Sequence, residues 1–151
     1  MSGEYLETTV DKFTFKVMRG CWYSKEGVWV AATGDVLRAG VTDFVQQTNG
    51  DMAFVEVVPA VGQTVAVGQD LCSLETVKAA IGLPSPVGGI VRTINAVLER
   101  SPELVNEDPY GAGWLAEIEP ADWDADRATL LSPEEYLETV RGQAEYEMTR
   151  R

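Results

Sequence analysis

The chain has 151 residues, 45% of them hydrophobic, and a formal net charge of −12 from 24 acidic and 12 basic side chains. We expect residues 1–151 to form a single domain, because a chain of this size and apolar content can bury one sizeable core. The two cysteines have no zinc-site spacing, and histidine, the commonest metal ligand and proton-transfer group, is absent. The missing histidine and zinc-site spacing argue against a metalloenzyme or an independent hydrolase. The net negative charge argues against a protein that binds nucleic acid or an anionic membrane.

The sequence also lacks the signals of membrane insertion and of export. No stretch approaches the ~18 consecutive apolar residues of a membrane span. The start, MSGEYLETTVDK, lacks the basic and then apolar pattern of a signal peptide. We therefore expect a cytoplasmic protein. Its partners should be basic or neutral, unless the acidic surface serves only solubility.

The first fifty residues predict three strands and a short helix. Residues 13–18 show the period-2 alternation of a half-buried strand, within an N-terminal extension of residues 1–20. Residues 27–40, GVWVAATGDVLRAG, predict two strands joined by a turn at 33–35. A helix should follow, opened by the Thr42 hydroxyl and closed at the Asn-Gly pair of residues 49–50.

Short apolar segments separated by glycine and proline then predict further strands, MAFVEVV, TVAV, DLCSLE, AAIGL and GIVRTI. Many short strands at close spacing indicate a mainly β fold, a sandwich or flattened barrel. Helical signals return after residue 100, where Ser101 is a candidate cap of a short turn. A full capping box begins at Ser132 and predicts a C-terminal helix over residues 132–142, with a frayed tail beyond.

Lys78 lies between two of the predicted strands, DLCSLE and AAIGL, and the connecting TVK is long enough only for a tight reversal. It should therefore be at an exposed tip, where a lysine has no packing role. Residues 26–151 contain seven arginines and only this lysine. One interpretation is that Lys78 simply makes a turn more soluble. The alternative, favoured by its isolation, is that its amine is an attachment point for an acyl group on a flexible tether.

Two segments carry a family resemblance. LETVKAAIGLPSPVGG resembles the lipoylation hairpin of glycine cleavage system H proteins, and SPELVNEDPYGAGWLAEI resembles their downstream signature. The resemblance extends over residues 23–118. It implies a flattened β-barrel of the lipoyl-domain, or barrel-sandwich hybrid, type with short peripheral helices and a C-terminal helix. It also implies a non-catalytic carrier with lipoate attached covalently to Lys78.

The resemblance assigns roles to the neighbours of this lysine. Glu75 matches the family's acidic position and would help a lipoate-protein ligase recognise the hairpin. Val77 and Ala79 flank Lys78, whereas a biotin carrier normally has a methionine beside its lysine.

Within the signature, NEDPYGAGW has the composition of a structural turn. Asp108 and Pro109 begin a good turn sequence, Gly113 allows a close approach, and Trp114 can cover the end of the barrel. The alternative is that this segment forms a wall of the cleft in which the arm docks.

Three features depart from the glycine cleavage pattern. Gly27 stands where these H proteins usually have a histidine that, in the family, lines the cleft of the loaded arm; the N-terminal lead is long; and two cysteines are present. Together they resemble the H-protein-like lipoate-binding proteins of sulfur-oxidising prokaryotes. Our first hypothesis is therefore a carrier of sulfur-bound intermediates and electrons for a heterodisulfide-reductase-like complex.

The alternative hypothesis is the glycine cleavage carrier, which serves glycine decarboxylase, aminomethyltransferase and dihydrolipoamide dehydrogenase. A third is a storage or decoy protein that uses the fold only for binding.

The cysteines allow two interpretations. Cys72, six residues before Lys78, could exchange with the ring sulfurs of lipoate. A cysteine in such a strand is more often a small buried hydrophobe, and Cys21 has the same interpretation. We expect no disulfide between them in a reducing cytoplasm.

Overall fold

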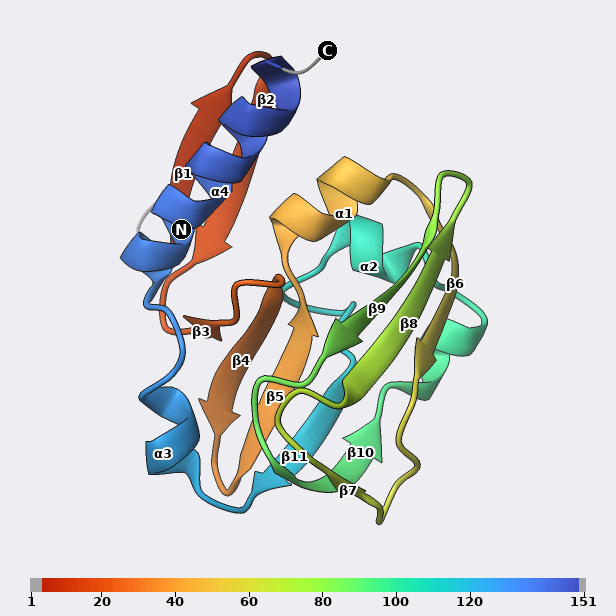
Figure 1. The fold of residues 1–151 in the computed structure, drawn as a ribbon. Coiled ribbons are helices and arrows are strands. Elements are labelled where there is room, and N and C mark those ends of the chain that lie inside the picture. The colour runs from red at the N-terminus through yellow and green to blue at the C-terminus, as the bar shows by residue number, and fades with distance from the viewer. Residues whose placement is uncertain (1–3, 150–151) are drawn as a thin grey trace.

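The computed structural model describes residues 4–149 and contains two facing β-sheets (Figure 1). Strand makes up 40% and helix 24% of the structure, so the mainly β prediction is confirmed. The first sheet has the order β3-β4-β5-β11-β10-β7 and the second β6-β8-β9. Aliphatic side chains from both sheets, including Val30, Leu74 and Ile118, form the main core between them.

The strands of the first sheet are β3 (Trp22–Tyr23), β4 (Val28–Thr33), β5 (Val36–Val41), β7 (Thr64–Val65), β10 (Gly89–Ile94) and β11 (Ala116–Pro120). Those of the second sheet are β6 (Met52–Val57), β8 (Asp70–Thr76) and β9 (Ala80–Pro84). The remaining elements are β1 (Tyr5–Val10), β2 (Phe13–Met18), α1 (Asp43–Asn49), η1 (Ala96–Glu99), α2 (Leu104–Glu107), α3 (Trp123–Arg127) and α4 (Pro133–Thr149).

The predicted hairpin and helix of the N-terminal half are confirmed. Strands β4 and β5 pair antiparallel around a turn in which Gly34 has a positive φ of 64°. Helix α1 begins at the Thr42 hydroxyl, which accepts a hydrogen bond of 3.4 Å from the Val45 N–H. It ends at Gly50, whose φ of 87° only glycine adopts readily.

The N-terminal extension contains a two-stranded hairpin, β1–β2, so the prediction of a single strand there was incomplete. The hairpin packs against α4 and α1 around a second core, in which Phe15 and Val17 contact the region of Tyr136 and Val140. Strand β1 pairs with the adjacent β2, but the helix it packs against, α4, lies at the other end of the chain, so no local pattern indicated this packing.

Helix α4 continues to Thr149, and the predicted end at residue 142 was wrong. The capping box itself is confirmed, because Glu135 N–H donates to the Ser132 hydroxyl and Ser132 N–H donates to the Glu135 carboxylate. Gly142 does not end the helix, because the next turn buries Ala144 against the N-terminal hairpin. The predicted fraying beyond residue 142 was wrong for residues 143–149, which are helical. Residues 150–151 lie outside the described range.

Two smaller predictions were also inaccurate. Ser101 does not cap a helix through its side chain, because α2 begins three residues later, at Leu104. TVAV forms a strand only at β7, whereas the short elements η1 and α3 were not predicted. Across residues 4–149, no helix is both long and apolar enough to cross a membrane.

Candidate functional site

Lys78 lies in the turn between β8 and β9, residues 77–79, as predicted. Thr76 N–H donates to the Ala79 carbonyl at 2.8 Å. The Thr76 hydroxyl accepts bonds of 3.2 Å from the backbone N–H groups of both Lys78 and Ala79. This hydroxyl replaces the glycine or asparagine that such turns usually require, because among the described residues Asp11 is the only non-glycine with positive φ.

The Lys78 side chain is exposed and folds toward α1. Its Nζ donates a hydrogen bond of 2.8 Å to the carbonyl of Thr48. That carbonyl belongs to the last turn of α1, where helix carbonyls carry partial negative charge and have no partner within the helix. Within the described part of the chain, Lys78 has no carboxylate partner, and the amine is reachable from solvent.

A small hollow of about 90 Å³ adjoins Lys78. Its lining comes from β2, α1 and α4, namely Phe13, Phe15, Gln47, Thr48, Ala144 and Glu147. Sequence reasoning missed this arrangement, because the three elements are far apart along the chain. Each element had a local signal of its own, but none of these signals indicated that the three elements meet beside Lys78.

The neighbours of Lys78 are available at the surface. Val77 is 99% exposed, and Ala79 and Glu75 are also exposed. Glu75 lies three residues before Lys78 on β8, where it pairs with Ala80 of β9 and Phe54 of β6. The turn therefore brings Glu75, Val77 and Ala79 together around the lysine, all accessible to a large partner.

The NEDPYGAGW segment packs as a structural turn. Pro109 carbonyl accepts a bond of 2.9 Å from the Trp29 indole, and the Asp108 carboxylate accepts one of 2.9 Å from the Ala112 N–H. The predicted close approach at Gly113 is confirmed, because a Cβ there would lie 2.5 Å from the Leu104 carbonyl oxygen.

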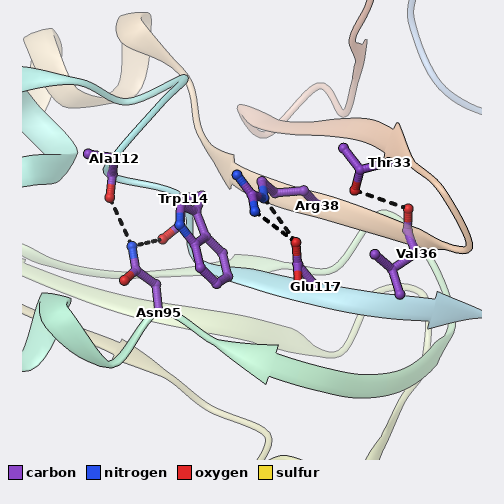
Figure 2. A network of polar contacts seen from close by, with 7 residues as sticks. All are labelled: Thr33, Val36, Arg38, Asn95, Ala112, Trp114 and Glu117. Carbon is purple, nitrogen blue, oxygen red and sulfur yellow. Dashed lines mark hydrogen bonds and ion pairs between the residues drawn. The ribbon is translucent and has the colours of Figure 1, made fainter.

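Figure 2 shows how this segment is held on the first sheet. The Asn95 amide donates to the carbonyls of Ala112 and Trp114, at 2.9 and 2.8 Å. The Arg38 guanidinium lies 4.6 Å from the centre of the Trp114 ring and binds the Glu117 carboxylate at 2.9 Å. None of these residues lines the hollow beside Lys78, but residues 106–110 line a second hollow of about 260 Å³, and Gln47 lines both hollows. The segment therefore packs as a turn and also forms the wall of a hollow.

Both cysteines are free and buried, as the second interpretation predicted. Burial raises the pKa of the Cys72 thiol to about 12 and that of Cys21 to about 11. Because the thiolate is the reactive form, both groups stay protonated and inert near neutral pH. Cys72 is therefore poorly suited to exchange with ring sulfurs.

Gly27 is buried rather than part of an open cleft. Its φ is 102°, and a Cβ would lie 2.2 Å from Val45 Cγ2 and 3.5 Å from the Tyr136 hydroxyl. No larger side chain fits here without moving α1. The packing around Gly27 therefore leaves no room for a histidine side chain at this position.

Two facing sheets that present a lysine on an exposed β-turn define a carrier of the lipoyl-domain class. The family model for the glycine cleavage H-protein matches residues 21–143. The glycine cleavage system H protein of Coprothermobacter proteolyticus is 48% identical, over 83% of this chain and 98% of the relative. That of Carboxydothermus hydrogenoformans is 41% identical, over 82% and 93%. A crystal structure of the H protein from Mycobacterium marinum superposes with a TM-score of 0.71 and 31% identity, over 79% of this chain and 94% of that one.

The chain belongs to the glycine cleavage H-protein family. Members of this family are non-catalytic carriers with lipoate bound covalently to a lysine, which confirms the predicted class and cofactor. The relatives are named for glycine cleavage. They support our alternative hypothesis and give no support to the sulfur-oxidation hypothesis or to its heterodisulfide-reductase-like partner.

Proposed function

We propose that this chain is lipoylated on Lys78 and carries the aminomethyl group released from glycine. Its partners would be glycine decarboxylase, aminomethyltransferase and dihydrolipoamide dehydrogenase. The observation that carries the proposal is the display of the Lys78 amine on an exposed turn, in a chain that belongs to the H-protein family. The sulfur-oxidation pathway has no comparable support.

The residues around Lys78 fit a lipoyl amide. When bound, the group supplies a ring disulfide that accepts the aminomethyl group. Acylation removes the lysine charge but leaves one N–H on Nζ, which can still donate to the Thr48 carbonyl. No buried ion pair has to be broken, and the half-buried ring of Phe13 offers an apolar surface beside the start of the arm.

Recognition by the attaching enzyme would use the exposed residues of the same turn. We propose that Glu75 is the acidic contact of a lipoate-protein ligase, whose binding site must accept a hairpin carrying a free amine. Val77 and Ala79 would lie against that site, since both are exposed on either side of the lysine.

The first experiment is intact-mass analysis of the protein after treatment with lipoate, ATP and a lipoate-protein ligase. We expect the mass increment of one lipoyl amide on the wild type and none on Lys78→Arg. Lys25→Arg is the matched control, because Lys25 is also exposed, and it should acquire the increment normally. An unmodified wild type, or a Lys78→Arg variant that is still modified, would contradict the attachment site.

The second experiment separates the two pathways. Lipoylated protein is incubated with pyridoxal phosphate-loaded glycine decarboxylase and glycine radiolabelled at its α-carbon, and the radioactivity bound to the protein is counted. The label must be at this carbon because the carboxyl carbon leaves as CO2. We expect loading that depends on lipoylation. Lipoylated protein that accepts no label, under conditions where another H protein does, would rule out the glycine pathway.

A further inference from the structure

The open edge of the second sheet lies next to the lysine turn. Strand β6 is the terminal strand of the order β6-β8-β9 and pairs only with β8. In the described part of the chain, residues 53–57 make no backbone hydrogen bonds outside their own sheet. An edge strand of this kind offers unpaired N–H and C=O groups that an extended segment can use.

A groove of about 320 Å³ follows this edge, between β6 and η1. Its walls are mainly apolar: Phe54 is 43% exposed, and Ile94 and Leu98 line the interior. Val97 of η1, also 43% exposed, adds to the apolar surface nearby. Large apolar side chains gathered at one exposed place on a strongly charged protein are typical of a surface that binds a partner.

The register places the groove beside the functional turn. Phe54 is opposite Glu75 on β8, and Met52 is opposite Thr76, at the base of the turn that carries Lys78. A partner held in the groove would therefore have its own surface close to the swinging arm. Such tethering raises the effective concentration of the arm at the partner's active site.

Charge determines which occupant fits. Glu56 and Glu99 line the groove, which has no cationic side chain in its lining. A second copy of this chain would bring these carboxylates against their own counterparts, on molecules of net charge −12. A segment with basic side chains would instead be attracted.

We propose that the groove along β6 is the docking site for an extended segment, with apolar and Arg or Lys side chains, of an enzyme that the arm visits. The proposal rests on the proposed function, because the candidate enzymes are glycine decarboxylase, aminomethyltransferase and dihydrolipoamide dehydrogenase. The apolar side chains would enter between Phe54 and Leu98, and the cationic ones would pair with Glu56 and Glu99.

The test is amide hydrogen exchange of the lipoylated protein, alone and with each of the three purified enzymes in turn. We expect at least one enzyme to slow exchange in peptides covering residues 52–58 and 94–99. Unchanged exchange in both peptides with all three enzymes overturns the proposal, whether or not other regions become protected. Lipoylation is verified separately by intact mass, so failure of Lys78 acylation remains distinguishable from failure of the groove.

Variants give an independent measurement with the enzyme that protects the groove. Phe54→Ala should raise the KM for the lipoylated carrier by roughly fivefold or more, as truncation of a central contact does. Glu56→Lys should also raise KM and flatten its dependence on salt. Val67→Ala is the matched control, because Val67 is 55% exposed and lines a different hollow. Equal KM values for Phe54→Ala, Glu56→Lys and Val67→Ala would overturn the proposal.

Discussion

The hydroxyl of Thr76 determines the shape of the lysine turn. It accepts hydrogen bonds from the backbone N–H groups of Lys78 and Ala79, in a loop of residues 77–79 that contains no glycine. We predict that Thr76→Val slows lipoylation of Lys78 and lowers the free energy of unfolding by about 1 kcal/mol, the usual contribution of such a bond. Thr76→Ser keeps the hydroxyl and should behave as wild type. Ligase kinetics and urea unfolding measure both effects, and a Thr76→Val variant that is lipoylated at the wild-type rate would contradict the role of the hydroxyl.

Cys72 contributes to packing and not to redox chemistry. It is fully buried in the main core, and its raised pKa, about 12, leaves almost no thiolate at pH 8. We predict that Cys72→Ala leaves the rate at which dihydrolipoamide dehydrogenase oxidises the reduced, dithiol form of the lipoyl arm unchanged. In the folded wild type, iodoacetamide should react with this thiol only as the pH approaches 12 or the protein unfolds. Slower oxidation of the arm in Cys72→Ala would instead show that the thiol takes part.

Replacement by alanine should have opposite effects on stability at Gly113, in a turn, and at Gly142, inside α4. Gly113 follows α2, and a Cβ there would lie 2.5 Å from the Leu104 carbonyl oxygen and 2.9 Å from Val105 Cα. Backbone atoms cannot move aside easily, so Gly113→Ala should destabilise the protein by about 1–3 kcal/mol. Gly142 lies inside α4 with no atom within 4 Å of a Cβ. Gly142→Ala should stabilise by about 0.5–1 kcal/mol, because alanine is the better helix former.

Thermal and urea unfolding of both alanine variants test this pair directly. The opposite signs make each variant the control for the other, since both replace a hydrogen by a methyl group. If Gly142→Ala destabilised the protein, the helix would not continue through residue 142 in solution.

Elements with local signals could be predicted, and those set by distant contacts could not. The β4–β5 hairpin, α1 and the capping box of α4 depend on residues within a few positions of one another. The last two turns of α4 depend instead on the N-terminal hairpin, because Ala144 is buried in the core that the hairpin helps to form. The glycine at position 142 predicts a helix end, and no local pattern indicates the distant packing that lets the helix continue.

The molecule as a whole combines a family fold with an added N-terminal layer. The position of Lys78 could be predicted from its isolation in the sequence and from the resemblance of its hairpin. Its bond to the Thr48 carbonyl could not, because it joins the turn to the end of a helix 30 positions earlier. The groove along β6 could not be predicted from the sequence either, since it depends on which strand of the second sheet lies at the edge.

We expect the added N-terminal layer to be needed for the stability of α4 but not for the lipoylation of Lys78. The family match begins at residue 21, after the β1–β2 hairpin. Phe15 and Val17 of the hairpin are buried, and Phe15 packs edge-on against Phe44 of α1, with ring centres 5.2 Å apart. Removing these two side chains alone exposes apolar surface worth about 1.5–3 kcal/mol each.

We therefore predict that deletion of residues 1–20 lowers the melting temperature and reduces the helical circular dichroism signal, because the last turns of α4 lose their packing around Ala144. The Lys78 turn is held by the β8–β9 pairing and the main core, so lipoylation by the ligase should persist. Glu7→Ala is the control, because Glu7 is exposed on β1 and should change neither property. An unchanged helical signal after the deletion would show that α4 is stable without the hairpin. Loss of lipoylation in a deletion variant that remains folded would show instead that the added layer helps to present Lys78.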